Sequence, residues 1–139
     1  MWAIRHVAVG LLVRNGKILV EEGADRVSGA TYYRAPGGGI EVGETAEDAV
    51  RREFLEELGF TLSEVEPLGV LESSFTYEGE SRHEITHVFA ISAADPLPAA
   101  TVEVRIRDTG AVVRWMAIES LGAGGPPLYP RGALDLLRR

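Results

Sequence analysis

The 139-residue chain carries 21 acidic and 14 basic side chains, for a formal net charge of −7, and 45% of its residues are apolar. These values predict one globular domain over residues 1–139 and argue against duplex nucleic acid as a partner. The chain has no cysteine, which excludes disulfides, thiolate metal sites and cysteine nucleophiles and fits a cytoplasmic protein. It also lacks a run of about 18 apolar residues, so we expect no contact with a membrane.

The pattern of residues in the first part of the chain predicts a series of short strands. Residues 4–13 and 17–22 are predicted strands, and Asn15-Gly16 between them predicts a tight hairpin turn, because both turn positions need positive φ. A loop is expected over 23–30. A strand is predicted over 31–35, and Pro36 with the three glycines that follow should end it.

The segment 46–58 is the strongest helix prediction in the chain. Thr45 is a good capping residue, Asp48 lies at the third helical position as in a capping box, and Gly59 suits the left-handed conformation that ends many helices.

The second half of the chain again favours strands. Strands are expected near 66–76 and 84–91 and over 101–107 and 112–116, and a short helix is expected over 133–139. Strands interrupted by one strong helix predict an α+β fold, with a mixed sheet and helices packed on it.

Residues 83–87, HEITH, match H-E-x-x-H, with which a helix presents two zinc-binding histidines and a general base. The surrounding residues alternate in polarity and are rich in β-branched and aromatic side chains, so we predict a strand instead. On a strand, His83 and His87 would lie about 13 Å apart, too far to share one zinc ion. A zinc peptidase is therefore a weakly supported alternative.

Three glutamates, Glu53, Glu56 and Glu57, have the spacing that places side chains on one flank of the predicted helix. Like charges at this spacing destabilise a helix, and here they lie near the C-terminus, the unfavourable end of the helix dipole for an acid. A solvated helix face is the alternative explanation. A divalent cation would explain the cluster better, and carboxylate oxygens favour Mg²⁺ or Mn²⁺ over zinc.

The segment 38–60 resembles the Nudix box. Gly38 is followed after five residues by Glu44 and after seven more by the run Arg52-Glu53-Phe54-Leu55-Glu56-Glu57-Leu58-Gly59, so all seven fixed identities are present. Phe54 and Phe60 stand where the family more often has aliphatic residues. The resemblance implies an α/β/α sandwich with a mixed β-sheet between helices. It also implies a hydrolase that cleaves the phosphoanhydride bond of a nucleoside diphosphate linked to another moiety.

The resemblance also implies roles for single residues. The Gly37 carbonyl, Glu53, Glu56 and Glu57 would hold Mg²⁺ or Mn²⁺, and Arg52 would orient the glutamates, while Glu44 would brace the loop and helix. Glu53 is our choice for the general base. Because some relatives take the base from outside the box, the alternatives for this role are Glu84, Glu103 and Asp108.

Substrate contacts are predicted from position alone, at Arg34, Tyr33, His83 and Glu84. Arg34 could meet a phosphate, and Tyr33 or Phe75 could stack on a base. The substrate could be a nucleotide sugar, ADP-ribose or a nucleoside triphosphate, including an oxidised one, and a nucleoside diphosphate conjugate is slightly favoured although no residue discriminates between them. The resemblance leaves open a homodimer. A non-catalytic nucleotide sensor is the main alternative function, although the complete set of box glutamates favours an enzyme.

Overall fold

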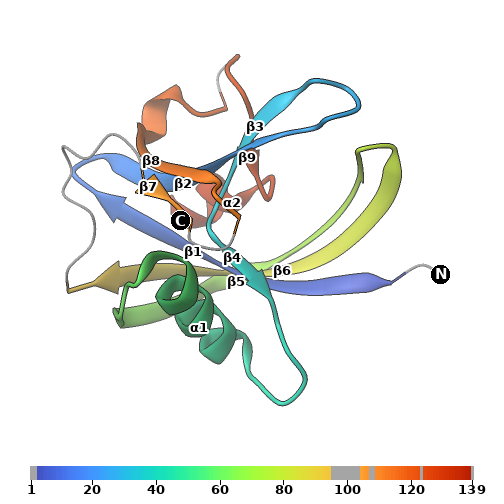
Figure 1. Ribbon diagram of the computed structural model, residues 1–139. Helices are drawn as coiled ribbons and strands as arrows, with labels where there is room; N and C mark the ends of the chain where they lie inside the picture. The colour runs from blue at the N-terminus through green and yellow to red at the C-terminus, as the bar shows by residue number, and fades with distance from the viewer. Residues whose placement is uncertain (1–2, 95–103, 107–108, 123, 139) are drawn as a thin grey trace.

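The computed structural model describes residues 3–94, 104–106, 109–122 and 124–138. They form a curled, mixed β-sheet with a helix on each side (Figure 1). The elements are β1 (Ile4–Arg14), β2 (Lys17–Ala24), β3 (Thr31–Arg34), β4 (Gly37–Gly39), α1 (Ala46–Leu58), β5 (Leu62–Tyr77), β6 (Glu80–Ala93), β7 (Val104–Arg105), β8 (Val112–Ala117), the 3₁₀ helix η1 (Ile118–Ser120), β9 (Leu128–Tyr129) and α2 (Ala133–Leu137).

The strand order explains why the sheet separates into two hairpins beyond β1. The main path runs β5-β6-β1-β2-β3-β9, with β1 parallel to β6 and β3 parallel to β9, so the predicted mixed sheet is confirmed. One edge of β1 pairs with β6 over residues 4–12. Its other edge pairs with β4 over residues 7–9 and with β2 only over residues 13–14. The β2–β3 hairpin therefore diverges from the long β5–β6 hairpin.

Alternate residues of the central strands enter two apolar layers, and the two helices cover these layers. Ala8 and Leu12 of β1 pack in the layer that holds Phe54 of α1. Val9 and Leu11 pack in the other layer, which α2 covers. Burial on both faces gives the predicted sandwich of helices around a sheet, although α2 has only five residues.

Most local predictions are confirmed. The turn at Asn15-Gly16 has φ values of 53° and 75°, as a tight hairpin turn requires. Helix α1 spans the predicted residues, with a capping box between Thr45 and Asp48 and a left-handed Gly59. The HEITH segment lies within β6, so it is a strand, as expected.

The lengths of several strands differ from the predictions. Strand β2 extends two residues into the expected loop, and β5 and β6 are both longer than predicted, because pairing across the hairpin continues through residues without an apolar pattern. The glycines after Pro36, expected to end a strand and to form a loop, form β4 beside β1. The predicted strand over 101–107 lies partly outside the described residues, as do the base candidates Glu103 and Asp108. None of the described helices has the length and apolar character needed to cross a membrane.

Candidate active site

The glycine strand β4 passes so close to its neighbours that two of its residues have no room for a side chain. A Cβ on Gly37, whose φ is 153°, would lie 2.0 Å from the Ala8 carbonyl oxygen. A Cβ on Gly38 would lie 2.5 Å from the carboxyl carbon of Glu53. The glycines therefore let the backbone of β4 lie directly against the Glu53 carboxylate on α1.

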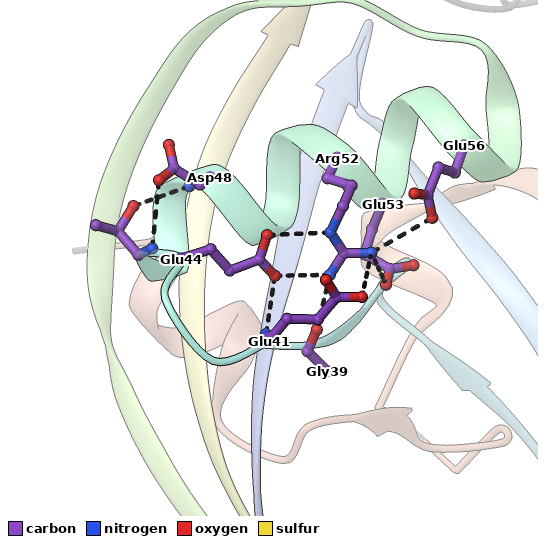
Figure 2. A network of polar contacts seen from close by, with 8 residues as sticks. Gly39, Glu41, Glu44, Asp48, Arg52, Glu53 and Glu56 are labelled. Atoms are coloured by element: carbon purple, nitrogen blue, oxygen red, sulfur yellow. Dashed lines mark hydrogen bonds and ion pairs between the residues drawn. The ribbon is translucent and has the colours of Figure 1, made fainter.

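Arg52 connects α1 to the loop that precedes it (Figure 2). Its Nη2 donates to the Gly39 carbonyl at 3.0 Å, and its guanidinium makes a bidentate pair with Glu44, at 2.7 and 3.1 Å. Glu44 in turn accepts a hydrogen bond from the backbone amide of Glu41. Because a planar guanidinium fixes both the position and the orientation of its partners, this network holds the loop at a set distance from the helix.

The same guanidinium faces two of the box glutamates. Arg52 Nη1 donates to Glu53 Oε1 at 2.9 Å and to Glu56 Oε2 at 3.3 Å. The Glu53 side chain is only 14% exposed, whereas that of Glu56 is 54% exposed. Arg52 thus holds Glu53 beside the glycine strand, and Glu56 lies nearer the solvent. Burial disfavours the charged form of Arg52, but its carboxylate partners raise its pKa overall.

Glu57 lies beside Glu53 in a crowded acidic environment. Burial, a hydrogen bond with Glu53, and repulsion from Glu53 and Glu21 raise the pKa of Glu57 from 4.5 to about 8. Arg34 opposes this shift. Two carboxyl groups that share a proton in this way occupy a place where a cation could replace that proton.

Arg34 lies on the strand that leads into the glycines. Its Nε lies 3.3 Å from Glu21 Oε2, and its Nη2 donates to the Gly37 carbonyl at 3.4 Å. The pairing of β2 with β3 places Glu21 directly opposite Arg34. Arg34 therefore lies at the carboxylate site and carries a positive charge that faces Glu57 as well as Glu21.

The donor set suits a hard divalent cation in part. Glu53, Glu57 and the Gly37 carbonyl offer only oxygen atoms, the ligand type that Mg²⁺ and Mn²⁺ prefer. The third box glutamate, Glu56, is turned toward Arg52. Among the described residues, no three carboxylate or imidazole side chains are grouped closely enough to hold a metal ion as they stand. The arrangement thus suits a cation held by two carboxylates and one backbone oxygen, and does not form a preorganised site of three carboxylates.

The remaining predicted substrate residues are placed differently. His83 Nε2 lies 2.6 Å from Glu72 Oε2 across the β5–β6 pair. Glu84 forms an ion pair with Arg5 at 3.4 Å. Tyr33 is half-buried and packs against the apolar layer that α2 covers. Each of these residues has protein contacts in the described structure, and Arg34 bonds to the glycine strand.

Sequence reasoning missed Glu21, which faces both Arg34 and Glu57. It is separated from them by 13 and 36 positions, so no local spacing indicates the contact. Only the register of the β2–β3 hairpin, which the length of the turn between its strands sets, brings Glu21 opposite Arg34.

Comparison with known proteins places this site within one family. Residues 4–136 match the family model described as the NUDIX domain. The chain is 38% identical over 135 residues to an 8-oxo-dGTP diphosphatase of Escherichia coli K12, covering 96% of both proteins. It is 31% identical over 105 residues to an oxidized purine nucleoside triphosphate hydrolase of Danio rerio, a match that covers 76% of this chain and 65% of the relative.

A solved structure has a similar fold. The MutT NUDIX hydrolase from Burkholderia pseudomallei is 25% identical, with a TM-score of 0.68 and coverage of 97% of both chains. An RNA pyrophosphohydrolase of Acidiphilium cryptum is 33% identical over 118 residues, which are 84% of this chain and 60% of the relative. The chain thus spans less than two thirds of two of these relatives and nearly the whole length of the other two.

Proposed function

This chain belongs to the Nudix family, and we propose that it hydrolyses a nucleoside triphosphate to the nucleoside monophosphate and pyrophosphate in the presence of Mg²⁺ or Mn²⁺. As a Nudix hydrolase it is a pyrophosphohydrolase that acts on acid anhydrides. The observation that carries the proposal is the Glu53 carboxylate, which lies against Gly38 with Glu57 beside it.

Two relatives favour this substrate class over a nucleotide sugar or ADP-ribose. Both the Escherichia coli and the Danio rerio protein are named for the hydrolysis of an oxidised purine nucleoside triphosphate. The Escherichia coli relative carries more weight, because the match covers 96% of its length. An oxidised purine triphosphate is therefore the first substrate to test, and its normal counterpart is the matched comparison.

Glu53, Glu57 and the Gly37 carbonyl would hold the ion, and Glu56 would join them only by leaving Arg52. The ion, when bound, supplies a positive charge that neutralises phosphate oxygens and lowers the pKa of a nearby water. Manganese could serve equally, because its ligand preferences are the same.

The chain's own residues would position the reactants. Glu53 would accept the proton of the attacking water, and Arg52 would keep the Glu53 carboxylate in place for this transfer. Arg34, beside the Gly37 carbonyl, would meet a phosphate oxygen of the substrate. The balanced reaction is one nucleoside triphosphate and one water giving a nucleoside monophosphate and pyrophosphate.

The test is to incubate the protein with Mg²⁺ in ¹⁸O-labelled water with a panel of nucleotides, and to identify the products by mass. We expect nucleoside monophosphate and pyrophosphate, one of them carrying the label, and no reaction after chelation of the metal. Glu53→Gln should lower kcat by about 10³-fold, whereas Glu47→Gln, on the exposed side of the same helix, should leave it unchanged. Orthophosphate as the first product, or binding without turnover by the metal-loaded protein, would refute the proposal.

A further inference from the structure

The β2–β3 and β5–β6 hairpins meet again at their tips. Arg26 at the first tip donates to the carboxylate of Glu78 at the second, through Nε at 2.8 Å, Nη2 at 3.3 Å and its backbone amide at 3.0 Å. The backbone amide of Glu78 donates to Asp25 Oδ2 at 2.8 Å. We call Asp25, Arg26 and Glu78 the tip clasp.

The clasp adds backbone hydrogen bonds to a surface ion pair in which the Arg26 side chain is 87% exposed. It combines a two-pronged arginine–carboxylate contact with two hydrogen bonds to backbone amides, and the Glu78 side chain is only 19% exposed. Hydrogen bonds from Arg26 lower the pKa of Glu78, and those from Glu78 and Ser28 lower the pKa of Asp25. Both acids are therefore held as carboxylates by partners on the opposite hairpin or the same turn.

Aromatic rings connect the same two hairpins behind the clasp. Tyr32 of β3 meets the ring of Tyr77 of β5 edge-on, at 6.2 Å between centroids, and the ring of Tyr129 of β9 at 5.6 Å. Phe75 of β5 stacks on Tyr129 at 6.3 Å and 27°. These four rings, each half-buried, form what we call the aromatic bridge.

Tyr32 reaches the other hairpin because its strand neighbour has no side chain. Gly23 pairs with Tyr32 across β2 and β3, and a Cβ on Gly23 would lie 2.3 Å from the Tyr32 ring. The ring therefore lies over the backbone of β2. Burial and a hydrogen bond with Tyr77 raise the pKa of Tyr32 to about 12, so it stays a neutral phenol.

The bridge leads from the clasp back to the carboxylate site. Tyr129 pairs with Arg34 in the parallel β3–β9 register, and Arg34 contacts the Gly37 carbonyl beside Glu53. Along β3 the order from the site outward is therefore Arg34, Tyr32 and then the hairpin tip with Arg26. At about 3.3 Å per residue, the tip lies about 10 Å beyond Arg34 along the strand.

We propose that the Arg26–Glu78 clasp is a positioning device that sets the spacing of the aromatic bridge, against which the base of the nucleotide stacks. This inference rests on the proposed function. Four half-buried rings from three strands lie near the phosphate-binding end, and stacking on aromatic rings is tolerant of base identity. Opening the clasp would let the hairpins separate and weaken base binding, while the carboxylate site would stay intact.

The test uses Glu78→Gln and Arg26→Ala in the full chain, with kinetics on two substrates. For the nucleoside triphosphate, KM should rise by about two- to tenfold, the range expected when ordered groups must be fixed again on binding, while kcat should stay within twofold. Inorganic tripolyphosphate has an anhydride but no base, so its hydrolysis should be unchanged. The reversed pair R26E/E78R should have a lower KM than either R26E or E78R alone.

Two controls separate positioning from folding. Glu47→Gln breaks an exposed ion pair with Arg51 on α1, far from the bridge in sequence, and should leave both substrates unaffected. Phe75→Leu removes one ring of the bridge and should raise KM for the nucleotide alone.

If the wild type hydrolyses nucleotides and Glu78→Gln has the same KM as the wild type, the clasp inference fails and the proposed function stands. If Glu78→Gln impairs tripolyphosphate equally, the clasp serves only stability. If the wild type hydrolyses neither substrate, the proposed function itself fails.

Discussion

The loop and helix over residues 37–58 and the joined hairpin tips are both held by arginine–carboxylate pairs, but the contacts differ in range. In the loop–helix segment, Arg52 bonds to partners 13 positions away or fewer. At the tips, Arg26 and Glu78 are 52 positions apart in the chain. The first network depends on a helix and a short loop alone, whereas the second depends on the register of four strands. The proposed catalytic Glu53 is thus fixed by local contacts, whereas the proposed base-stacking surface depends on the sheet register.

The largest expected effect tests whether the chemistry resides in the local segment. Glu53→Gln should lower kcat for nucleoside triphosphate hydrolysis by about 10³-fold, the scale of losing a positioned general base. Because the amide is isosteric and can still contact Arg52, the free energy of unfolding should change little. Steady-state kinetics and urea unfolding measure the two effects. If the variant retained more than a tenth of wild-type turnover, another residue would have to be the general base.

Adjacent glycines give a sharper test within the same segment. Gly37→Ala places a Cβ against the Ala8 backbone at positive φ and should lower the free energy of unfolding by about 3 kcal/mol. Gly38→Ala meets only the flexible end of Glu53 and should cost less than about 1 kcal/mol.

The kinetics should depend on Gly38 despite its smaller effect on stability. Gly38→Ala should lower kcat by about 10- to 100-fold, because it displaces the Glu53 carboxylate from its position. Urea unfolding and kcat, measured on both variants, check the pair. A Gly38→Ala variant with full turnover would show that the close approach of Glu53 to β4 has no catalytic use.

Substitution of one arginine in each region compares their contributions to stability directly. Arg52→Ala leaves Glu44, Glu53 and the Gly39 carbonyl without their shared donor and should lower the free energy of unfolding by about 2 kcal/mol. Arg26→Ala removes a side chain that is 87% exposed and should lower the free energy of unfolding by less than Arg52→Ala does. Chemical denaturation of both variants at equal ionic strength checks the difference, and Arg52→Lys, which keeps the charge without the fork, should fall between Arg52→Ala and wild type.

The local part of the structure was the part that sequence reasoning could predict. The bounds of α1, its caps and the turn at Asn15-Gly16 depend on neighbouring residues and were correct. The strand over 84–91 was also correct in type, because its composition outweighed a helical zinc motif. Sequence spacing could not predict the pairing of Glu21 with Arg34, because it depends on sheet register.

The same difference between local and long-range contacts applies to the predicted residues of the candidate site. Glu53 and Glu57 could be selected from spacing on one helix and Arg52 from the family resemblance, and the structure places their side chains together. The predicted contacts at His83 and Glu84 came from strand position alone, and these residues bond to Glu72 and Arg5 in the structure. Their roles in substrate binding stay predictions, as does that of Glu56 as a metal ligand.

A pH dependence also separates the two regions. The pKa of Glu57 is raised to about 8 in the folded protein, from an ordinary value of 4.5. Between these values the folded state binds more protons than the unfolded state, so the free energy of unfolding should fall as pH rises. The pKa of Glu78, and that of Asp25, is lowered, so the stability they contribute should be lost as pH falls below their ordinary values of 4.5 and 3.8.

Urea unfolding of the metal-free protein between about pH 3 and 9 measures both slopes. Glu57→Gln should flatten the decline on the alkaline side only, and Glu78→Gln should reduce the decline on the acid side, to which Glu44 also contributes through its lowered pKa. Added Mg²⁺ should stabilise the wild type increasingly as pH rises toward 8, because an ion at Glu53 and Glu57 competes with the shared proton. If the free energy of unfolding of the wild type changes with pH on the alkaline side as it does in Glu57→Gln, the two carboxyl groups do not share a proton. The site would then lack the concentrated negative charge that favours a cation between Glu53 and Glu57.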